Sequence, residues 1–559
     1  MAFDGIVTKA VISELNEYII GAKVNKIFEP TKNEIILGLY SSGKNYSLNL
    51  SINPDSCRIN LSTHSKANPF NAPNFCMLLR KYLIGSRIIS INTPDLERVV
   101  EIVFEGYNEM NDLITRKLFL EIMSRQSNII FTNENNIIID TLKHVDNSSR
   151  NLLPANPYVL PNNDKISFLN LKDFSEFNSY ISNSELPSLD TKLCSLFIGF
   201  SKSFINCSLS ELNIDNINYS KEDLINLYNY IKKIISNFGT NNISCTNINS
   251  NDFSIILKNS SNLDINFFVD DFYYEKEENN LFKSAKNNLL KIILSSLKKC
   301  SKKLENINSK LKECDSMDTY RLYGELLTSN LYKLKENTSS ITLENYYDNN
   351  NLIEITLDKS ISPHKNADKY FKKYNKLKNA LKIVSIQKQE AEKELEYIES
   401  IIFSLESAED LIDINEIYEE VSQNLITKKE IEKNKKSSKH KEKEKISINN
   451  ITTLEENGFT IFIGKNNIQN DYLTLKYANK NDIWFHTQKI HGSHVILRLN
   501  GNELNDDILY RCASIAMQNS KAKNSSNVPV DYTYVRYVKK SPNSKPGMVI
   551  YTNYKTIFV

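Results

Sequence analysis

The sequence predicts a multidomain α+β protein, on three observations. Its 559 residues exceed what one hydrophobic core usually holds, so several domains are expected. Segments with helical periodicity and segments with strand periodicity are mixed near both ends of the chain. Between them lie two long runs of apolar residues at heptad spacing, which indicate a coiled coil.

Residues 1–168 are expected to form the first domain, in which helices and a sheet are mixed. Apolar residues recur at helical spacing over residues 8–20 and 75–83, whereas residues 34–40 and 46–52 alternate like neighbouring strands of a meander. Further strands are expected at residues 99–104, 118–123 and 128–131.

Residues 169–268 form the second expected domain, which is rich in asparagine and serine and contains short helical stretches. Within it, Leu196 to Ser201 has the pattern of a helix that ends in a glycine turn. This pattern resembles a helix-hairpin-helix, in which the turn presents backbone N–H groups to phosphate. A plain helix end at Gly199 is the alternative, since glycine commonly follows the last helical residue.

Residues 269–427 are expected to form a coiled-coil arm, because apolar residues alternate three and four positions apart in two runs. The first run comprises Leu290, Ile293, Leu297, Cys300, Leu304, Ile307, Leu311 and Cys314. The second comprises Tyr370, Tyr374, Leu377, Leu381, Val384, Lys388, Ala391, Leu395, Ile398, Ile402 and Leu405. We expect the two runs to pair within one chain as antiparallel helices of ~40 to 50 Å. A homodimeric coiled coil is the alternative.

The segment between the two runs predicts a β-hairpin at the far end of the arm. Residues 341–347 and 352–357 have strand character and flank an Asp-Asn-Asn-Asn turn, so the hairpin is expected near residues 341–357. A helix over residues 320–334 precedes it. An arm of this kind is typical of a spacer whose tip contacts something large.

Residues 428–446 are expected to be a basic linker, because nine lysines and four glutamates lie in this tract. Contact of these lysines with nucleic acid is the alternative. The last domain is expected to span residues 447–559 and to have an α/β fold. Its strands are expected at residues 460–463, 482–486, 494–497 and 532–538, and its helix at residues 507–520.

The last domain contains the most distinctive residues of the chain. Trp484 is the only tryptophan, and His486, His491 and His494 are three of the seven histidines. Strand alternation places Trp484 and His486 on one face. Because aromatic rings and imidazoles can stack on bases or bond phosphate, we expect a recognition surface for RNA. Arg536 adds positive charge near the end of a later strand.

Two other interpretations of these residues remain open. The histidines could ligate a metal ion, although no nearby cysteine or acid completes a tetrahedral set. Trp484 could pack in the core and His494 could cap a backbone group, which the sequence alone supports equally well. We expect neither a metal nor a cofactor.

Several function classes find no support in the sequence. No Walker loop, dinucleotide-binding fingerprint, nucleophile elbow or zinc-protease motif occurs, so we expect no enzyme. The net charge of +2, from 69 basic and 67 acidic residues, neither requires nor excludes nucleic acid. Eight cysteines without a C-x-x-C pair favour reduced thiols. Without a signal peptide or an apolar stretch of ~20 residues, a cytoplasmic protein with no membrane segment is expected.

In their order, these parts resemble the NFACT family over essentially the whole chain. The resemblance is carried by residues 1–5 (Met-Ala-Phe-Asp-Gly), 75–81, 323–327 and 366–376, and by the G-K-N-N, W-F-H and G-S-H runs of the last domain. It implies a glycosylase-like N-terminal α+β domain, a helix-hairpin-helix region, a long antiparallel coiled coil and a C-terminal RNA-binding domain. Ala2 stands where formamidopyrimidine-type glycosylases need proline, and their four-cysteine zinc finger is missing, so glycosylase activity is not expected.

The resemblance implies a factor of ribosome-associated quality control. Such a factor binds the large (50S) ribosomal subunit obstructed by peptidyl-tRNA, and recruits alanyl-tRNA for template-free addition of alanines to the stalled chain. The expected partners are the 50S subunit with its rRNA, peptidyl-tRNA, alanyl-tRNA and a small RNA-binding protein of the same process. Family members also carry a fibronectin-binding label, so a surface adhesin is the alternative. The chain shows no repeats, anchor or wall-sorting motif that would favour it.

The resemblance also implies functional residues in the first domain. The family's Asp-Arg pair falls on Glu97 and Arg98, and its Glu-Ile-Met run falls on Glu121, Ile122 and Met123. Glu97 departs from the family by keeping the charge on a side chain that is one methylene longer. Arg98 would pair with tRNA phosphate or a base edge while the acid orients it. A purely structural ion pair is the alternative.

Further departures from the usual residues of the family are Ser124, Gln126 and His491. None of them removes a charge that the implied tRNA contact needs. The expected RNA-binding residues of the last domain are Lys465, Asn466, Asn467, Trp484, His486, Ser493, His494 and Arg536.

Overall fold

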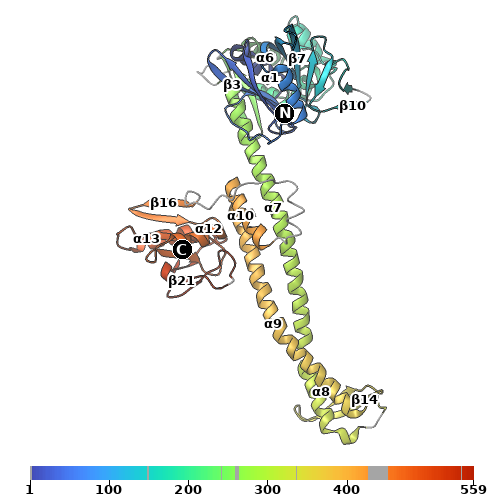
Figure 1. Ribbon diagram of the computed structural model, residues 1–559, viewed down its shortest axis with the longest axis vertical. Coiled ribbons are helices and arrows are strands. Elements are labelled where there is room, and N and C mark those ends of the chain that lie inside the picture. Colours follow the sequence, from blue (N-terminus) through green and yellow to red (C-terminus); the bar gives the residue numbers. More distant parts are fainter. Residues whose placement is uncertain are drawn as a thin grey trace. The chain divides into compact units, whose positions relative to one another are not determined.

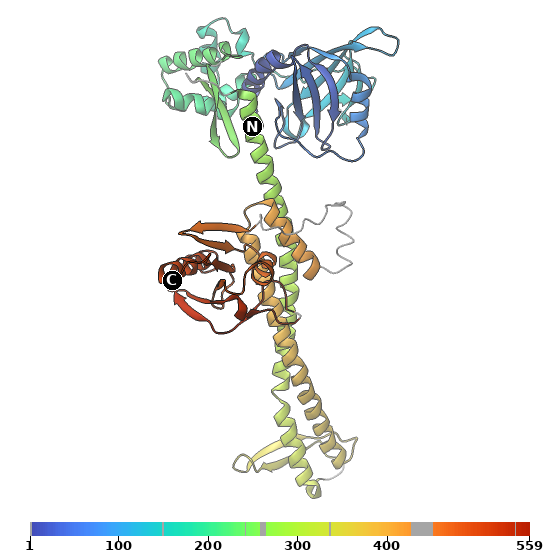
Figure 2. The ribbon, with the colours of Figure 1, turned by 60° about the vertical axis from the view of Figure 1, so that its left-hand side comes forward.

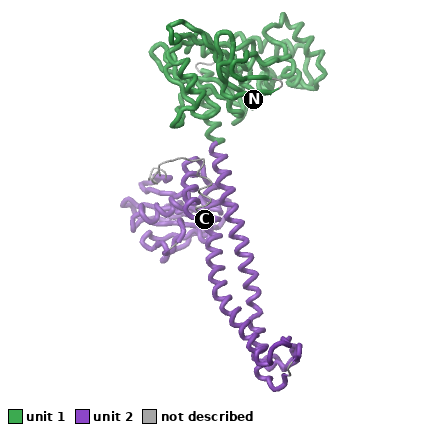
Figure 3. Tube along the Cα trace, turned by 45° about the vertical axis from the view of Figure 1, so that its right-hand side comes forward, with its two compact units in different colours: residues 1–280 green, residues 281–559 purple. Residues whose placement is uncertain are grey.

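The computed structural model describes residues 3–147, 150–240, 242–257, 264–334, 337–425, 451–542 and 544–559. The chain divides into two compact units, residues 1–280 and 281–559, which Figure 3 shows in two colours. The mixed helix and sheet class is confirmed. Ala2 and the expected basic linker at 428–446 lie outside the described residues. None of the described helices combines the length and the apolar character that crossing a membrane requires.

The first unit is built on a nine-stranded antiparallel sheet with the order β4-β3-β2-β1-β5-β6-β7-β8-β9. The strands are β1 (Lys23–Phe28), β2 (Glu34–Ser41), β3 (Lys44–Ser51), β4 (Arg58–Leu61), β5 (Arg87–Asn92), β6 (Val99–Tyr107), β7 (Leu113–Glu121), β8 (Asn128–Asn133) and β9 (Ile138–Thr141). Helix α1 (Gly5–Ile19) packs against β4 and β5, and α2 (Asn74–Leu83) packs against β1. The meander expected from residues 34–52 is therefore confirmed.

A helical layer completes the first unit. It consists of α3 (Phe174–Ser182), α4 (Leu189–Leu196), α5 (Lys202–Leu212) and α6 (Lys221–Ser236), followed by the hairpin β12 (Ile243–Asn249) and β13 (Asp252–Leu257). A single hydrophobic core extends from Phe3 to Tyr273 and includes both the sheet and these helices. The expected boundary at residue 168 falls inside this core, since Phe168 packs edge-on against Phe177 and Phe197.

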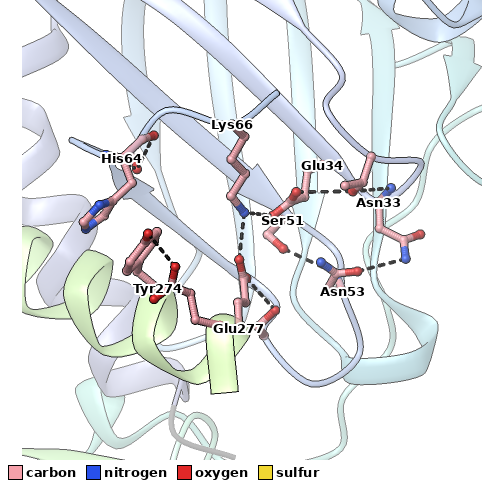
Figure 4. A network of polar contacts seen from close by, with 12 residues as sticks. Asn33, Glu34, Ser51, Asn53, His64, Lys66, Tyr274 and Glu277 are labelled. Carbon is pink, nitrogen blue, oxygen red and sulfur yellow. Dashed lines mark hydrogen bonds and ion pairs between the residues drawn. The ribbon is translucent and has the colours of Figure 1, made fainter. Parts of the chain in front are cut away.

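The long helix α7 (Ile265–Cys314) begins inside the first unit, one turn earlier than expected. The carboxylate of Glu14 accepts hydrogen bonds from the backbone N–H groups of Ile265 and Asn266, both at 2.9 Å. Farther along the helix, the Nζ of Lys66 bridges Glu34 at 2.6 Å and Glu277 at 2.7 Å (Figure 4). These contacts fix the start of α7 to α1 and to the sheet.

In the second unit, α7 runs antiparallel beside α9 (Pro363–Ser407), as both Figure 1 and Figure 2 show. The direction follows from the pairs that touch: the Nζ of Lys286 donates to the carbonyl oxygen of Glu406 at 3.0 Å, and farther along α7 the Sγ of Cys300 lies 3.5 Å from the carbonyl oxygen of Ala391. All residues of the two heptad runs are buried or half-buried. The coiled coil is therefore intramolecular, as expected.

The far end of the arm carries the expected hairpin. Strands β14 (Ser340–Asn345) and β15 (Asn351–Thr356) pair antiparallel, and α8 (Met317–Ser329) precedes them. Leu343 and Ile355 pack with Leu326 and Tyr370 in a small separate core. The tip is thus a folded module with its own apolar interior.

The last domain of the second unit is a six-stranded antiparallel sheet in the order β16-β17-β19-β18-β20-β23. Its strands are β16 (Thr452–Glu456), β17 (Phe459–Ile463), β18 (Ile483–Thr487), β19 (Val495–Arg498), β20 (Pro529–Tyr534) and β23 (Lys555–Phe558). Helix α13 (Asp506–Gln518) covers one face. Helix α12 (Asn467–Tyr472) and a π-helical turn (Leu473–Tyr477) follow β17, and the turn packs on the other face.

One expected strand of this domain is wrong in part. The strand predicted over residues 532–538 ends at Tyr534, where a 3-10 turn (Val535–Tyr537) and the short strand β21 (Val538–Lys539) take over. The turn lets Val535 and Val538 pack beside Trp484 on the face opposite α13.

Candidate nucleic-acid interface

The family-implied residues of the first unit lie together at one end of the β6–β7 hairpin. Arg98 directly precedes β6 and Ile122 directly follows β7, and the N–H of Ile122 donates to the carbonyl oxygen of Arg98 at 2.8 Å. Val99 and Glu121 are paired across the two strands. Antiparallel pairing therefore brings two segments together that are more than twenty positions apart in the sequence.

Glu121 lies inside the fold. Its side chain is fully buried, forms an ion pair with the guanidinium of Arg150, and accepts a hydrogen bond from the hydroxyl of Tyr158 at 2.9 Å. Burial and the charge of Glu121 raise the pKa of Tyr158, so this hydroxyl remains a donor. Ile122 is also fully buried, whereas Met123 is half-buried. Glu121 and Ile122 are therefore interior residues, and the charge of Glu121 is engaged by Arg150 inside the fold.

Glu97 and Arg98 are half-buried, so they are closer to solvent than Glu121. The amide of Asn163 donates to Glu97 at 2.8 Å. Arg98 lies near the carboxylate of Asp4, which is buried, caps α1 through the N–H of Val7 at 2.9 Å, and accepts from the hydroxyl of Ser201 at 2.5 Å. Burial raises the pKa of Asp4 to about 6, against the opposing effects of these hydrogen bonds and of the Arg98 charge.

Three segments that are far apart in the sequence meet beside Arg98, and their backbones approach one another closely. The N–H of Gly5 donates to the carbonyl oxygen of Gly199 at 3.0 Å, and a Cβ on Gly5 would lie 1.9 Å from the carbonyl oxygen of Leu96. Gly199 has a φ of +82° in the turn between α4 and α5. The expected helix that ends in a glycine turn is present as α4, with α5 after the turn, and the turn packs against the start of the chain and the segment before β6. Its contact with phosphate stays a prediction.

In the last domain, the run Gly464–Asn467 forms a loop that we call the KNN loop. Asn466 caps α12, because its side chain accepts from the N–H of Gln469 at 2.8 Å. The loop faces α10 (Leu411–Asn424), the helix that follows α9. The amide nitrogen of Asn466 donates to Glu416 at 2.7 Å and that of Asn467 to Glu420 at 2.9 Å. Both asparagines are buried by these contacts.

Lys465 and Glu420 complete this interface. The Nζ of Lys465 lies 2.9 Å from Glu409, just before α10. Glu420 also accepts from the hydroxyl of Tyr397 at 2.7 Å. The Tyr397 hydroxyl and the Asn467 amide donate to the same carboxylate oxygen, and the other oxygen is buried without a partner among the described residues. Burial raises the pKa of Glu420 to about 7. The amides that the sequence suggested for RNA are therefore engaged by acids of the same chain.

The expectation that Trp484 lies on a recognition surface for RNA is wrong, because its side chain is 0% exposed. Strand β18 lies between β19 and β20, and both faces of the sheet are covered there, one by α13 and the other by the π-helical turn and the segment after β20. Trp484 and His486 do share a face and stack with centroids 5.7 Å apart. The indole N–H has no hydrogen-bond partner among the described residues. Core packing, the alternative that the sequence left open, is the correct description of Trp484.

The histidines beside Trp484 are neutral near neutral pH. Burial lowers the pKa of His486 to about 4 and that of His494 well below its ordinary value. His494 is buried and shares a 2.7 Å hydrogen bond with the hydroxyl of Thr474, and Ser493 is buried next to it. His491 lies apart from them, 3.7 Å from Glu399. These rings line a pocket of about 1060 Å³ between α9 and the last domain.

Arg536 is the expected RNA-binding residue that remains exposed. Its guanidinium lies 4.7 Å from the ring centre of Tyr534 and 5.2 Å from that of Tyr537. Lys539 and Lys540 are exposed beside it. Cations interleaved with aromatic rings form a surface that binds a phosphate backbone and stacks on bases. Sequence reasoning missed the two tyrosines, although the spacing Tyr-x-Arg-Tyr was a readable signal.

Comparison with known proteins extends over the whole chain. Residues 4–440 match a family profile described as NFACT N-terminal and middle domains, and residues 450–553 match one described as NFACT protein RNA binding domain. The chain is 36% identical over 575 residues to the Rqc2 homolog RqcH of Bacillus subtilis (strain 168), covering 100% of this chain and 98% of that protein. It is 32% identical over 568 residues to the Rqc2 homolog RqcH of Streptococcus pneumoniae (strain D39), with coverage of 100% and 98%.

Among solved structures, the N-terminal part of the fibronectin/fibrinogen-binding protein from Streptococcus suis is similar to 49% of this chain and is covered over 100% of its own length. The identity is 25% and the TM-score is 0.41.

Proposed function

The chain belongs to the NFACT family, and from this premise we propose that it is an RNA-binding factor of ribosome-associated quality control. Profiles of the family match nearly the whole chain, and relatives that are Rqc2 homologs match it over their full length. The observation that carries the proposal is the surface formed by the exposed Arg536 and Tyr534 and the half-buried Tyr537, because it lies in the domain that matches the RNA-binding profile.

In finer terms, we propose that the protein binds the 50S subunit with peptidyl-tRNA and recruits alanyl-tRNA for template-free alanine tailing. The exposed cations of the last domain would contact RNA, and Arg98 would contact the tRNA backbone from its position beside Asp4. The coiled-coil arm would place its hairpin tip on rRNA or on a ribosomal protein. Peptide transfer would be the chemistry of the ribosome, so the protein needs no catalytic residue and no cofactor. Its place of action would be the ribosome in the cytoplasm.

The experiment that tests this proposal is recovery of the tagged protein from its own cells, with sequencing of the bound RNA and mass spectrometry of the bound proteins. We expect large-subunit rRNA and one dominant tRNA, without small-subunit rRNA. The identity of that tRNA would name the amino acid that is added. A preparation free of rRNA and tRNA would overturn the proposal.

Binding to fibronectin or fibrinogen is stated in the name of the Streptococcus suis protein. For the present chain the adhesin alternative stays untested, and none of the described residues supplies an observation that favours it.

A further inference from the structure

The KNN loop binds carboxylates through side chains that are also suited to phosphate. Lys465, Asn466 and Asn467 of the loop, together with Gln469 of α12, supply an ammonium group and three amide nitrogens. All of them donate to acids on or beside α10, and two of the amides, those of Asn466 and Gln469, share one oxygen of Glu416 at 2.7 Å each.

A phosphodiester offers the same chemistry as these acids. Its unesterified oxygens carry a negative charge and accept several hydrogen bonds, as a carboxylate does, and both groups attract ammonium and amide donors. The two kinds of acceptor cannot occupy the same donors together, because each amide hydrogen is used once and two anions at one position repel each other.

We propose that Glu409, Glu416 and Glu420 occupy the KNN loop in place of RNA phosphate, so that RNA and the acidic side of α10 compete for one set of donors. The proposal rests on the RNA-binding function above, and it adds that the acids on and beside α10 regulate RNA binding at the KNN loop. Binding of RNA at the loop separates the loop from α10, and the closed contact lowers the affinity of the free protein for RNA.

Two features make this contact suitable for displacement. The outer ion pair is accessible, since the side chain of Glu409 is 76% exposed and that of Lys465 is 28% exposed. Exposed ion pairs are weak and are screened by salt. At the inner end, one oxygen of Glu420 is buried without a partner among the described residues, so the closed state leaves a polar group unsatisfied.

The first test compares two double variants of the full-length chain. Glu409→Ala with Glu416→Ala removes two carboxylates that contact the loop. The control, Glu406→Ala with Glu419→Ala, removes two exposed carboxylates that are not among the acids paired with the loop, one at the end of α9 and one on α10. The two variants have the same net charge, so a general gain in attraction for RNA affects both equally.

Affinity is measured by fluorescence anisotropy with a short, labelled, unstructured single-stranded RNA at one fixed salt concentration. We expect the Glu409/Glu416 variant to bind about fivefold or more tightly than the control variant. Equal affinities of the two variants would overturn the competition.

The second test reads the contact directly in the unaltered protein. A zero-length carbodiimide reagent joins a lysine to a carboxylate at ion-pair distance, so Lys465 and Glu409 should be joined in the free protein. Saturating RNA should reduce the yield of this cross-linked peptide, as measured by mass spectrometry. Lys303 and Glu394, 3.0 Å apart in the coiled coil, provide an internal reference whose yield should not change.

The outcomes separate this inference from the function beneath it. RNA binding with an unchanged Lys465–Glu409 yield would overturn the competition and leave the proposed function standing. Failure of the unaltered protein and of both variants to bind RNA at low salt would instead overturn the RNA-binding function, and the competition with it.

Discussion

At the scale of single residues, Arg98 is the side chain on which the proposed tRNA contact depends. It lies near the buried Asp4, and its backbone is fixed by Ile122. Replacement by alanine should abolish alanine tailing, because the guanidinium fork is lost, while the sheet remains folded. Replacement by lysine should leave partial activity, since the charge stays and the fork does not. Tailing in a reconstituted 50S reaction checks both.

The matched control for Arg98 is Arg87→Ala, which removes an exposed guanidinium from the same sheet. Circular dichroism should show the same secondary structure for both variants. Normal tails from Arg98→Ala would refute the assignment.

The histidines packed against Trp484 predict a stability that falls in acid. The folded pKa of His486 is lowered to about 4, whereas an unfolded histidine keeps its ordinary value of ~6.5. The contribution is therefore complete above about pH 6.5 and is lost as the pH falls towards 4, because the unfolded state then binds more protons. Denaturant unfolding, followed by the fluorescence of Trp484, measures it.

Glu420 has a raised pKa and acts in the opposite direction, so the comparison must be made between variants. His486→Gln should flatten the pH dependence relative to the unaltered protein. His364→Gln, which removes an exposed imidazole of α9, is the control for the substitution itself. A slope that His486→Gln does not alter would contradict the assignment.

Trp484 also shows how much of a single residue's environment could be predicted from the sequence. Alternation in a strand correctly placed Trp484 and His486 on one face. It could not tell that this face is covered, because the cover comes from Leu473, Val535 and Tyr551, which are distant in sequence. Likewise, the meeting of Asp4 with Ser201 depends on packing between segments that share no local pattern.

At the scale of elements, the turn between α4 and α5 controls how the site around Arg98 is built. A Cβ on Gly199 would lie 2.4 Å from the carbonyl oxygen of Leu96, in addition to the strain of a positive φ. Gly199→Ala should therefore lower the free energy of unfolding of the first unit by about 2 kcal/mol or more. Thermal unfolding of the full chain measures the change.

Gly239→Ala separates the effect of a positive φ from the effect of a steric clash at the added Cβ. Gly239 has a φ of +75°, but a Cβ there would lie 3.6 Å from its nearest neighbour, which is ordinary contact. This variant should lose about 1 kcal/mol from backbone strain alone. Equal losses in the two variants would show that the close approach at Gly199 contributes nothing.

We predict that the hairpin at the end of the arm contacts the large partner. Tyr346, Tyr347 and Leu352 are exposed there, although the tip has its own core beneath them. Changing all three to serine should weaken co-sedimentation with 50S subunits, because exposed aromatic residues commonly anchor interfaces. Tyr510→Ser, an exposed tyrosine of the last domain, should have no such effect. Unchanged co-sedimentation would show that the tip is not the contact.

Elements were predictable where their pattern is long. The two heptad runs and strands β2 and β3 follow from periodicity, and all are present. Short elements such as α12 and β23 were missed, because six or four residues carry too little periodic signal. Their positions depend on capping by Asn466 and on pairing with β20.

At the scale of the whole molecule, charge is balanced and only its local distribution can attract RNA. The net charge is +2, so RNA binding must come from surfaces such as that around Arg536. The logarithm of the binding constant should fall linearly with the logarithm of salt concentration, with a slope of about −0.7 for each phosphate contacted. Arg536→Ala should reduce the slope by about that amount.

The control for this titration is Arg511→Ala, which removes an exposed arginine of the same domain that is paired with Glu456 on a different surface. Its slope should equal that of the unaltered protein. A binding constant that does not depend on salt would exclude phosphate as the principal contact.

The coiled coil has a consequence for how such proteins can vary in size. The small Ala391 is fully buried opposite Cys300, so the helices fit in a single alignment. A change of one heptad in both helices preserves this alignment and moves the tip by about 10 Å. A change that is not a whole number of heptads takes the apolar seam out of phase and rotates the hairpin about the helix axis. The arm can therefore become longer or shorter only in steps of about 10 Å.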